Sequence, residues 1–211
     1  MLDAVIEVAA PRRERKKQQT RGALIRAAME LFEAKGYDHT AVREITDAVD
    51  VSERTFFRYF ASKEDLALSF IRDMTGVLLR ALAARPPEED PLTALRRAFR
   101  ESLRVVSPGE GGHTADVLAI IRLIESTPSL LAAHLRYLHD NDNEMVRVLA
   151  DREGIDPADP RPWILAAVFG GLVSLANREW KTHGVGGVEA MLAAFDTYAD
   201  QVGPALSGHW T

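Results

Sequence analysis

Residues 40–63, with the sequence TAVREITDAVDVSERTFFRYFASK, constrain the fold of this chain more than any other stretch. Val42, Ile45 and Val49 recur at the i, i+3, i+7 spacing that places apolar side chains on one face of a helix. Thr40 stands just before them, where its hydroxyl is expected to cap the first helical turn. The apolar stripe then stops, so the pattern predicts a short helix followed at once by a turn.

A second short helix is predicted directly after this turn. Ser52 is its expected N-cap, and Phe56 and Phe60, four residues apart, share one face that is expected to enter a small core. Four residues fall largely outside that face: Thr55, Phe57, Arg58 and Tyr59. A short helix that presents aromatic rings and an arginine to solvent suits the major groove of DNA. The stretch therefore predicts a helix-turn-helix.

These residues resemble the helix-turn-helix of the TetR family of one-component transcriptional regulators. The resemblance is carried by VSERTFFRYF, residues 51–60, and by SKEDL, residues 62–66, and it extends over residues 22–66. Arg54 departs from it, because many members have glycine at that point. The resemblance implies a ligand-responsive transcriptional repressor that binds a palindromic double-stranded DNA operator as a homodimer and is released by a small hydrophobic molecule.

The family pattern also implies which residues meet the DNA. Thr55, Phe57 and Tyr59 are expected to contact it from the recognition helix. Lys63, at the start of the next helix, is expected to contact a phosphate.

Three arginines are further candidates for DNA contacts. Arg43 lies on the first exposed turn of the preceding helix, and its forked guanidinium suits the N7 and O6 atoms of guanine. Arg54 and Arg58 are expected to contact phosphates or bases.

The net charge of −5 argues by itself against binding to nucleic acid, but the charge is unevenly distributed. Residues 1–65 contain twelve Lys or Arg and twelve Asp or Glu, whereas residues 66–211 contain fourteen and nineteen. Within residues 12–21, six are basic and one is acidic. Such a run is often only a solvated tail, but beside a helix-turn-helix it favours contact with phosphates or an adjacent minor groove. Residues 1–17 are therefore expected to form a flexible basic arm.

The whole chain reads as helices joined by short breaks. The first predicted helix spans residues 20–35 and ends at Gly36, within a helix-turn-helix domain of residues 18–65. A larger domain, residues 66–211, is expected to bind the ligand and to form the dimer. The later predicted helices cover residues 62–84, 91–106, 117–125, 129–152, 163–183 and 188–206. The prediction is an all-α protein of about nine helices.

The last two of these helices are expected to form the dimer interface. Residues 163–176 contain no charge, which predicts a helix that is buried on all sides. Gly170 and Gly171 would let another helix approach it closely, and Met191 and Phe195 lie on the apolar stripe of the last helix. The alternative is that both faces belong to the internal core of one chain.

An effector site is expected as a mostly apolar cavity between helices of the larger domain. The candidate lining residues are Phe99, Leu103, Ile121, His134, Tyr137 and Phe169. For Phe169, filling of the core is the simpler interpretation.

Several classes of protein are disfavoured by what the sequence lacks. The chain has no cysteine, which excludes disulfides and thiolate metal sites. It has no phosphate loop, nucleophile elbow or zinc-protease motif, so neither enzymatic activity nor a cofactor or metal is expected. No apolar stretch is long enough to cross a membrane, so a cytoplasmic protein is expected. Two alternatives stay open: a helical partner-binding protein, and a helical enzyme whose head does not bind DNA.

Overall fold

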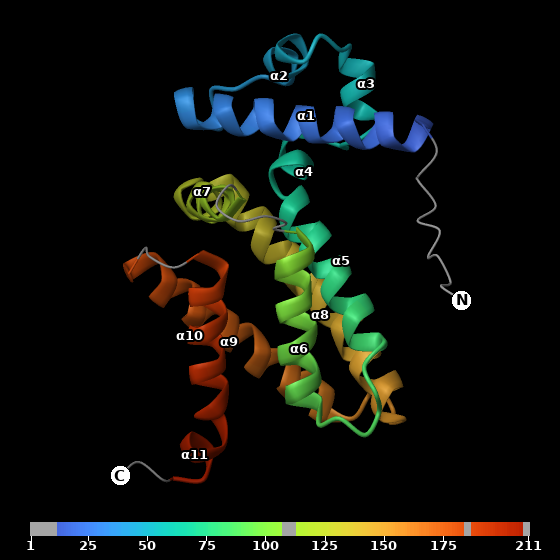
Figure 1. Ribbon diagram of the computed structural model, residues 1–211, viewed down its shortest axis with the longest axis vertical. Helices are drawn as coiled ribbons and strands as arrows, with labels where there is room; N and C mark the ends of the chain where they lie inside the picture. The colour runs from blue at the N-terminus through green and yellow to red at the C-terminus, as the bar shows by residue number, and fades with distance from the viewer. Residues whose placement is uncertain (1–11, 107–112, 184–186, 209–211) are drawn as a thin grey trace, which may run out of the picture. The chain divides into compact units, whose positions relative to one another are not determined.

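The computed structural model describes residues 12–106, 113–183 and 187–208, and Figure 1 shows its helices. Within these ranges the chain is helical apart from short connections and contains no strand, so the predicted all-α class is confirmed. The chain forms two compact units that divide between Leu68 and Ser69. None of the described helices is both long and apolar enough to cross a membrane.

The N-terminal unit is built from four helices: α1 (Arg12–Lys35), α2 (Val42–Ala48), α3 (Glu53–Phe57) and α4 (Lys63–Ala67). Helix α1 packs against α2 and α4, and α2 packs against α3. One small core joins them, and its most deeply buried members are Leu24, Ala28, Phe32, Ile45, Phe56, Phe60 and Leu66. The prediction that Phe56 and Phe60 are core residues is confirmed.

Helix α1 begins at Arg12 rather than at residue 20. The added turns are rich in Arg, Lys, Gln and Glu, which are strong helix formers. Thr20 lies inside the helix, where its hydroxyl donates to the Lys16 carbonyl at 3.0 Å. Residues 12–17 therefore belong to a helix and not to a flexible arm, which corrects the prediction. Residues 1–11 of the predicted arm lie outside the described residues.

The connection between α1 and α2 is capped differently from the prediction. Gly36 ends α1 as predicted, with a φ of +85° that glycine adopts easily. Thr40 is buried, and its hydroxyl donates to the Gly36 carbonyl at 2.9 Å, so it stabilises the end of α1 instead of capping α2. The N-cap of α2 is Ala41, whose N–H donates to the Glu44 carboxylate at 2.8 Å.

The C-terminal unit contains the remaining helices: α5 (Ser69–Ala83), α6 (Pro91–Val106), α7 (His113–Ser126), α8 (Pro128–Glu153), α9 (Pro160–His183), α10 (Gly187–Asp200) and α11 (Val202–Leu206). Helix α5 packs on α6, α9 packs on α10, and α8 contacts α5, α7 and α9 (Figure 1). The rings of Phe99, Phe169 and Phe195 meet in its core, with centroids 4.9 to 5.7 Å apart.

Two of the predicted helices are each divided in the structure, so the described residues form eleven helices where about nine were predicted. The predicted helix 62–84 breaks at Leu68, whose backbone leaves the helical region with φ −90° and ψ 0°. The predicted helix 188–206 breaks at Gln201. Pro204 accounts for the second break, because a proline suits the first turn of a new helix but not the interior of a continuing one.

Candidate functional site

Helix α3 is held by its cap at one end and by two buried rings along one side. The Ser52 hydroxyl accepts a hydrogen bond from the Thr55 N–H at 3.2 Å, which confirms the predicted cap. Phe56 is completely buried and Phe60 is 2% exposed. These contacts fix the rotation of α3 about its axis, and so they decide which of its side chains face solvent.

The exposed surface of α3 and the turn after it combines positive charge with aromatic rings. Arg54, Phe57 and Arg58 are exposed, and Thr55 and Tyr59 are half-buried. Phe57 is 54% exposed, and its ring packs edge to face with that of Phe56, 5.3 Å away between centroids. The Arg58 guanidinium lies over the Tyr59 ring at 5.1 Å, a cation–π contact. This surface can offer donors to phosphates and base edges, and an apolar ring to a thymine methyl.

The turn between α2 and α3 is tight although it contains no glycine. Asp50 takes a left-handed conformation with a φ of +54°, which aspartate tolerates better than most residues. The Val51 N–H then donates to the Thr46 carbonyl at 3.0 Å. The turn therefore fixes the angle between the two short helices through backbone geometry.

Arg43 stands on the exposed side of α2. Its side chain is 78% exposed, and its Nε lies 3.7 Å from the Asp47 carboxylate. An exposed ion pair of this kind contributes little free energy. The guanidinium can therefore leave Asp47 for a guanine without a large penalty.

Lys63 has internal partners at the point where a phosphate contact was predicted. Its ammonium donates to the carbonyls of Tyr37 at 2.6 Å and Thr40 at 2.8 Å. It also lies 4.1 Å from the centroid of the Tyr37 ring. Burial lowers the pKa of this ammonium, and burial likewise raises the pKa of Tyr37 to about 12. Lys63 thus ties the start of α4 to the connection that precedes α2.

The N-terminal turns of α1 extend the basic surface of this unit. Five basic side chains are exposed there: Arg12, Arg13, Arg15, Lys16 and Lys17. Residues 12–68 contain twelve Lys or Arg and ten Asp or Glu, so these helices carry a small positive charge within an acidic chain, although Asp3 and Glu7 make residues 1–68 neutral.

The residues predicted to line an effector cavity are divided between the core and its edge. Phe99, Leu103 and Phe169 are buried. Because the Phe99 and Phe169 rings pack edge to face at 5.6 Å, they fill the interior and do not line an open space. Ile121 is half-buried and packs against this core, and His134 is half-buried on α8.

Tyr137, the sixth predicted lining residue, is directed toward α5. Its ring lies under the Arg72 guanidinium, 5.3 Å from the ring centroid. Burial raises the pKa of its hydroxyl, against the lowering effect of a hydrogen bond with Thr75.

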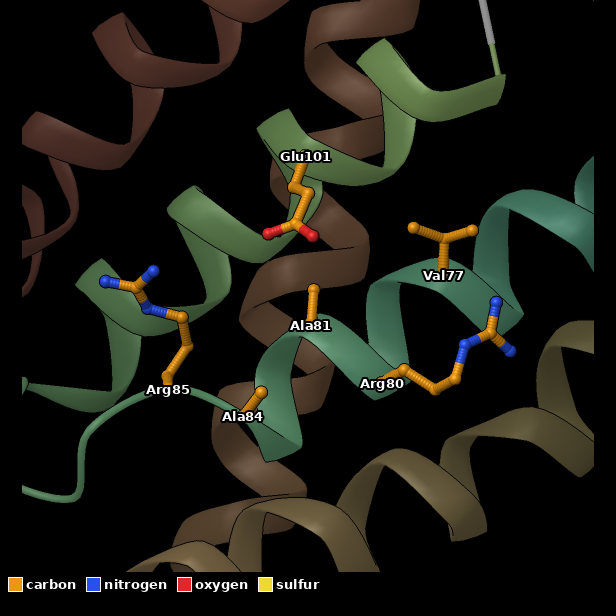
Figure 2. Close-up of a pocket in the computed structure, with 6 residues that line it drawn as sticks. All are labelled: Val77, Arg80, Ala81, Ala84, Arg85 and Glu101. Atoms are coloured by element: carbon orange, nitrogen blue, oxygen red, sulfur yellow. The ribbon is translucent and has the colours of Figure 1, made fainter. Parts of the chain in front are cut away.

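A pocket of about 220 Å³ opens between α5 and α6, and none of the six predicted residues lines it. Figure 2 shows Ala81 and Ala84 between Arg80 of α5 and Arg85, which follows that helix, with Glu101 on α6. Arg85 is already held by Glu89 through two bonds of 2.6 and 3.0 Å. This charged rim differs from the mostly apolar lining that was predicted. Over the described ranges, no group of three His, Asp or Glu side chains could hold a metal ion.

The residues predicted for the dimer interface separate into a buried pair and an exposed pair. Met191 and Phe195 are 3% and 1% exposed within their own unit, so they are core residues and the prediction for them is wrong. Gly170 and Gly171 are exposed, and a Cβ built on either would meet no atom within 4 Å.

The uncharged stretch of α9 is buried on one side only, contrary to the prediction. Trp163 and Ile164 are 44% and 61% exposed. An uncharged, mostly apolar strip therefore runs along the outer side of the helix, and we call it the α9 strip: Trp163, Ile164, Ala167, Gly170, Gly171 and Ser174. The sequence pattern identified this helix but not which of its sides is covered.

Two family models match the chain. Residues 24–70 match the model described as bacterial regulatory proteins, tetR family. Residues 89–203 match the model described as the MftR C-terminal domain. Together they account for both units.

Curated relatives match over nearly the whole length. The HTH-type transcriptional regulator TcmR of Streptomyces glaucescens is 43% identical over 201 residues, covering 94% of this chain and 89% of the relative. The putative mycofactocin biosynthesis transcriptional regulator MftR of Mycobacterium tuberculosis is 27% identical over 187 residues, covering 86% and 90%.

Solved structures share the fold at low sequence identity. NalD, the secondary repressor of the MexAB-OprM multidrug efflux pump in Pseudomonas aeruginosa, aligns with a TM-score of 0.54 and 19% identity, covering 87% of this chain and 96% of that one. A transcriptional regulator from Aquifex aeolicus aligns with a TM-score of 0.53 and 18% identity, covering 87% and 99%.

Proposed function

The chain belongs to the TetR family of bacterial transcriptional regulators, and from this premise we propose that it is a transcriptional repressor. It binds a palindromic operator as a homodimer. It leaves the operator when a small, largely apolar molecule binds the C-terminal unit. Members of the family regulate transcription through a DNA-binding helix-turn-helix and are not enzymes. A regulator of bacterial genes acts in the cytoplasm, where its DNA lies.

The observation that carries the proposal is the fixed orientation of α3. Because Phe56 and Phe60 are buried, the residues opposite them are held outward: Arg54, Phe57 and Arg58. An exposed phenylalanine between two arginines has no role in the core of this unit. In the major groove its ring can contact base edges while the arginines neutralise phosphates.

The dimer is supported by the size of the site that one head can read. A helix of five residues covers only a few base pairs, and two heads on one face of the duplex, about 34–36 Å apart or a multiple of that, read a longer palindrome. The α9 strip supplies an exposed apolar surface on which two copies can pair. The absence of side chains at Gly170 and Gly171 would let the two helices approach closely.

The release step follows from the difference between two states of the protein. A ligand can shift the equilibrium away from the DNA-binding state only if it binds the other state more tightly. The half-buried residues Ile121 and His134 are the predicted lining residues best placed to meet it.

Operator binding by an Arg43→Ala variant tests the base-contact role. Loss of a bidentate contact to guanine is expected to cost about 1–3 kcal/mol at one position of each half-site and to relax the preference there. Arg147→Ala is the matched control, because Arg147 is exposed on α8 of the C-terminal unit. Titrations on a set of operator variants measure both. An unchanged base preference in Arg43→Ala would remove Arg43 from the contact set.

A further inference from the structure

Three polar side-chain atoms in the first two turns of α8 and the last two turns of α9 are buried without a hydrogen-bond partner among the described residues: Nδ1 of His134, Oδ1 of Asn177 and Nε1 of Trp180. Trp180 is only 3% exposed and belongs to the core of the C-terminal unit. Buried polar atoms are nearly always paired, and each exception calls for an explanation. Two other atoms share this state, on Ser69 and Arg152, but they lie on other parts of the unit.

The three atoms lie at the same end of a helical hairpin. Helices α8 and α9 contact one another and are joined by the short connection 154–159. His134 lies near the start of α8 and Trp180 near the end of α9, so the two lie toward the ends of these helices that are remote from the connection. Asn177 is three residues from Trp180, which makes the two neighbours on the surface of α9.

An ion pair links helix α7 to this end of the hairpin. The Lys181 ammonium on α9 bonds to the Glu125 carboxylate on α7. Burial lowers the pKa of His134, and the same Glu125 carboxylate raises it by a smaller amount. The imidazole is therefore neutral near pH 7, while Glu125 and Lys181 neutralise each other. The carboxylate that acts on His134 is thus already paired with a lysine.

We propose that His134, Asn177 and Trp180 form the polar edge of the effector site, and that the effector is an uncharged, largely apolar molecule with a hydrogen-bond donor and acceptor on one edge, as in a phenol. The inference rests on the ligand response proposed above. The Trp180 N–H donates to an oxygen of the ligand, and the Asn177 carbonyl accepts from its hydroxyl. The His134 Nδ1 accepts or donates according to its tautomer. The apolar body of the ligand meets the core beside Ile121.

An Asn177→Leu variant of the full chain tests the unpaired amide oxygen before any ligand is added. Leucine has the branched shape of asparagine without its polar atoms, so it removes an unpaired buried group. The melting temperature of the ligand-free protein is expected to rise by about 2–4 °C. Asn143→Leu is the matched control, because Asn143 is exposed on α8 and should give no such gain.

A pair of probes that differ in one group tests the recognition. 2-Naphthol and 2-methylnaphthalene have nearly the same size, but only 2-naphthol has a hydroxyl. Wild-type protein is expected to bind 2-naphthol about tenfold more tightly, measured by tryptophan fluorescence or calorimetry. Asn177→Leu is expected to lose that preference while Asn143→Leu keeps it.

The outcomes separate this inference from the proposed function. Equal binding of the two probes by wild-type protein, or binding of neither, overturns the polar edge, as does an unchanged melting temperature in Asn177→Leu. If the preference is present and is lost in Asn177→Leu, but 2-naphthol leaves operator affinity unchanged, the polar edge stands and the proposed release from DNA fails.

Discussion

Two backbone carbonyls in the connection between α1 and α2 accept hydrogen bonds from the Lys63 ammonium. At the scale of single residues this contact adds to the apolar packing of α4 on α1 in holding α4 to the rest of the reading head. A lysine has three N–H donors, and two of them are used here on fixed acceptors. Lys63 is therefore a positioning residue in the free protein, although the position would also suit a contact with DNA.

A Lys63→Met variant distinguishes these two roles. Methionine keeps much of the apolar stem but leaves both carbonyls without their donor, which is expected to destabilise the N-terminal unit by about 1–3 kcal/mol. Operator affinity is expected to fall at every salt concentration, with an unchanged slope of log affinity against log salt. Loss of a phosphate contact would instead reduce that slope by about one unit.

The salt titration needs a lysine that is free of such internal bonds. Lys16→Met is the matched control, because Lys16 is exposed on the basic end of α1. If α1 contacts phosphates, this variant should reduce the salt slope without changing the melting temperature. If Lys63→Met reduced the slope of log affinity against log salt, Lys63 would be a phosphate contact after all.

At the scale of elements, α3 depends on its cap more than the longer helices do. It has only five residues, and a helix of that length is not stable by itself in water. The Ser52 hydroxyl accepts a hydrogen bond from the Thr55 N–H, one of the N–H groups of the first turn. It also lies 3.0 Å from the Thr55 hydroxyl. The cap and the two buried phenylalanines together hold the helix.

Substitution of Ser52 is expected to destabilise α3 by an amount that depends on the residue placed at the cap position. Ser52→Ala should cost about 0.5–2 kcal/mol, whereas Ser52→Gly should cost only a few tenths. Amide hydrogen exchange at Thr55 and operator affinity measure the effect. Protection of the Thr55 amide from exchange and operator affinity are both expected to decrease in the order wild type, Ser52→Gly, Ser52→Ala. Equal behaviour of the two variants would mean that the cap does not limit the reading head.

At the scale of the whole molecule, the α9 strip leaves an uncharged surface in contact with water. Exposed apolar patches on a folded unit commonly mark an interaction surface. The side of α9 opposite the strip is part of the core with Phe169 and Trp180. The helix therefore has one covered side within the chain and one side that a second copy could cover.

An Ile164→Glu, Ala167→Glu double variant tests the dimer. Charges on the α9 strip are expected to separate the two copies while the C-terminal unit stays folded, because neither position is in the core. Sedimentation should then show a monomer, and binding to a two-half-site operator should collapse. Leu135→Glu is the control, since Leu135 is 57% exposed on α8. A double variant that remains dimeric would place the interface elsewhere. Phe195→Arg is unsuitable for this purpose, because it would put a charge into the core.

The sequence by itself determined the features that depend on neighbours along the chain. Helix periodicity gave the all-α class, and local capping patterns identified Gly36 and Ser52. The spacing of Phe56 and Phe60 was sufficient to place both in the core of a helix-turn-helix. These features are local because a helix is built from contacts between residues three and four apart.

Only the tertiary structure decided which partner each face or polar group would have. Lys63 bonds to carbonyls that are 26 and 23 residues away, and no local pattern specifies such a contact. Periodicity grouped Met191 with Phe195 but did not reveal that α9 and α6 already cover them. The same limit applies to Asn177. In the sequence it is an ordinary helix residue, and only the structure shows that its side-chain oxygen is buried without a hydrogen-bond partner. Periodicity specifies which side chains share a face, whereas the packing of distant segments specifies what covers that face.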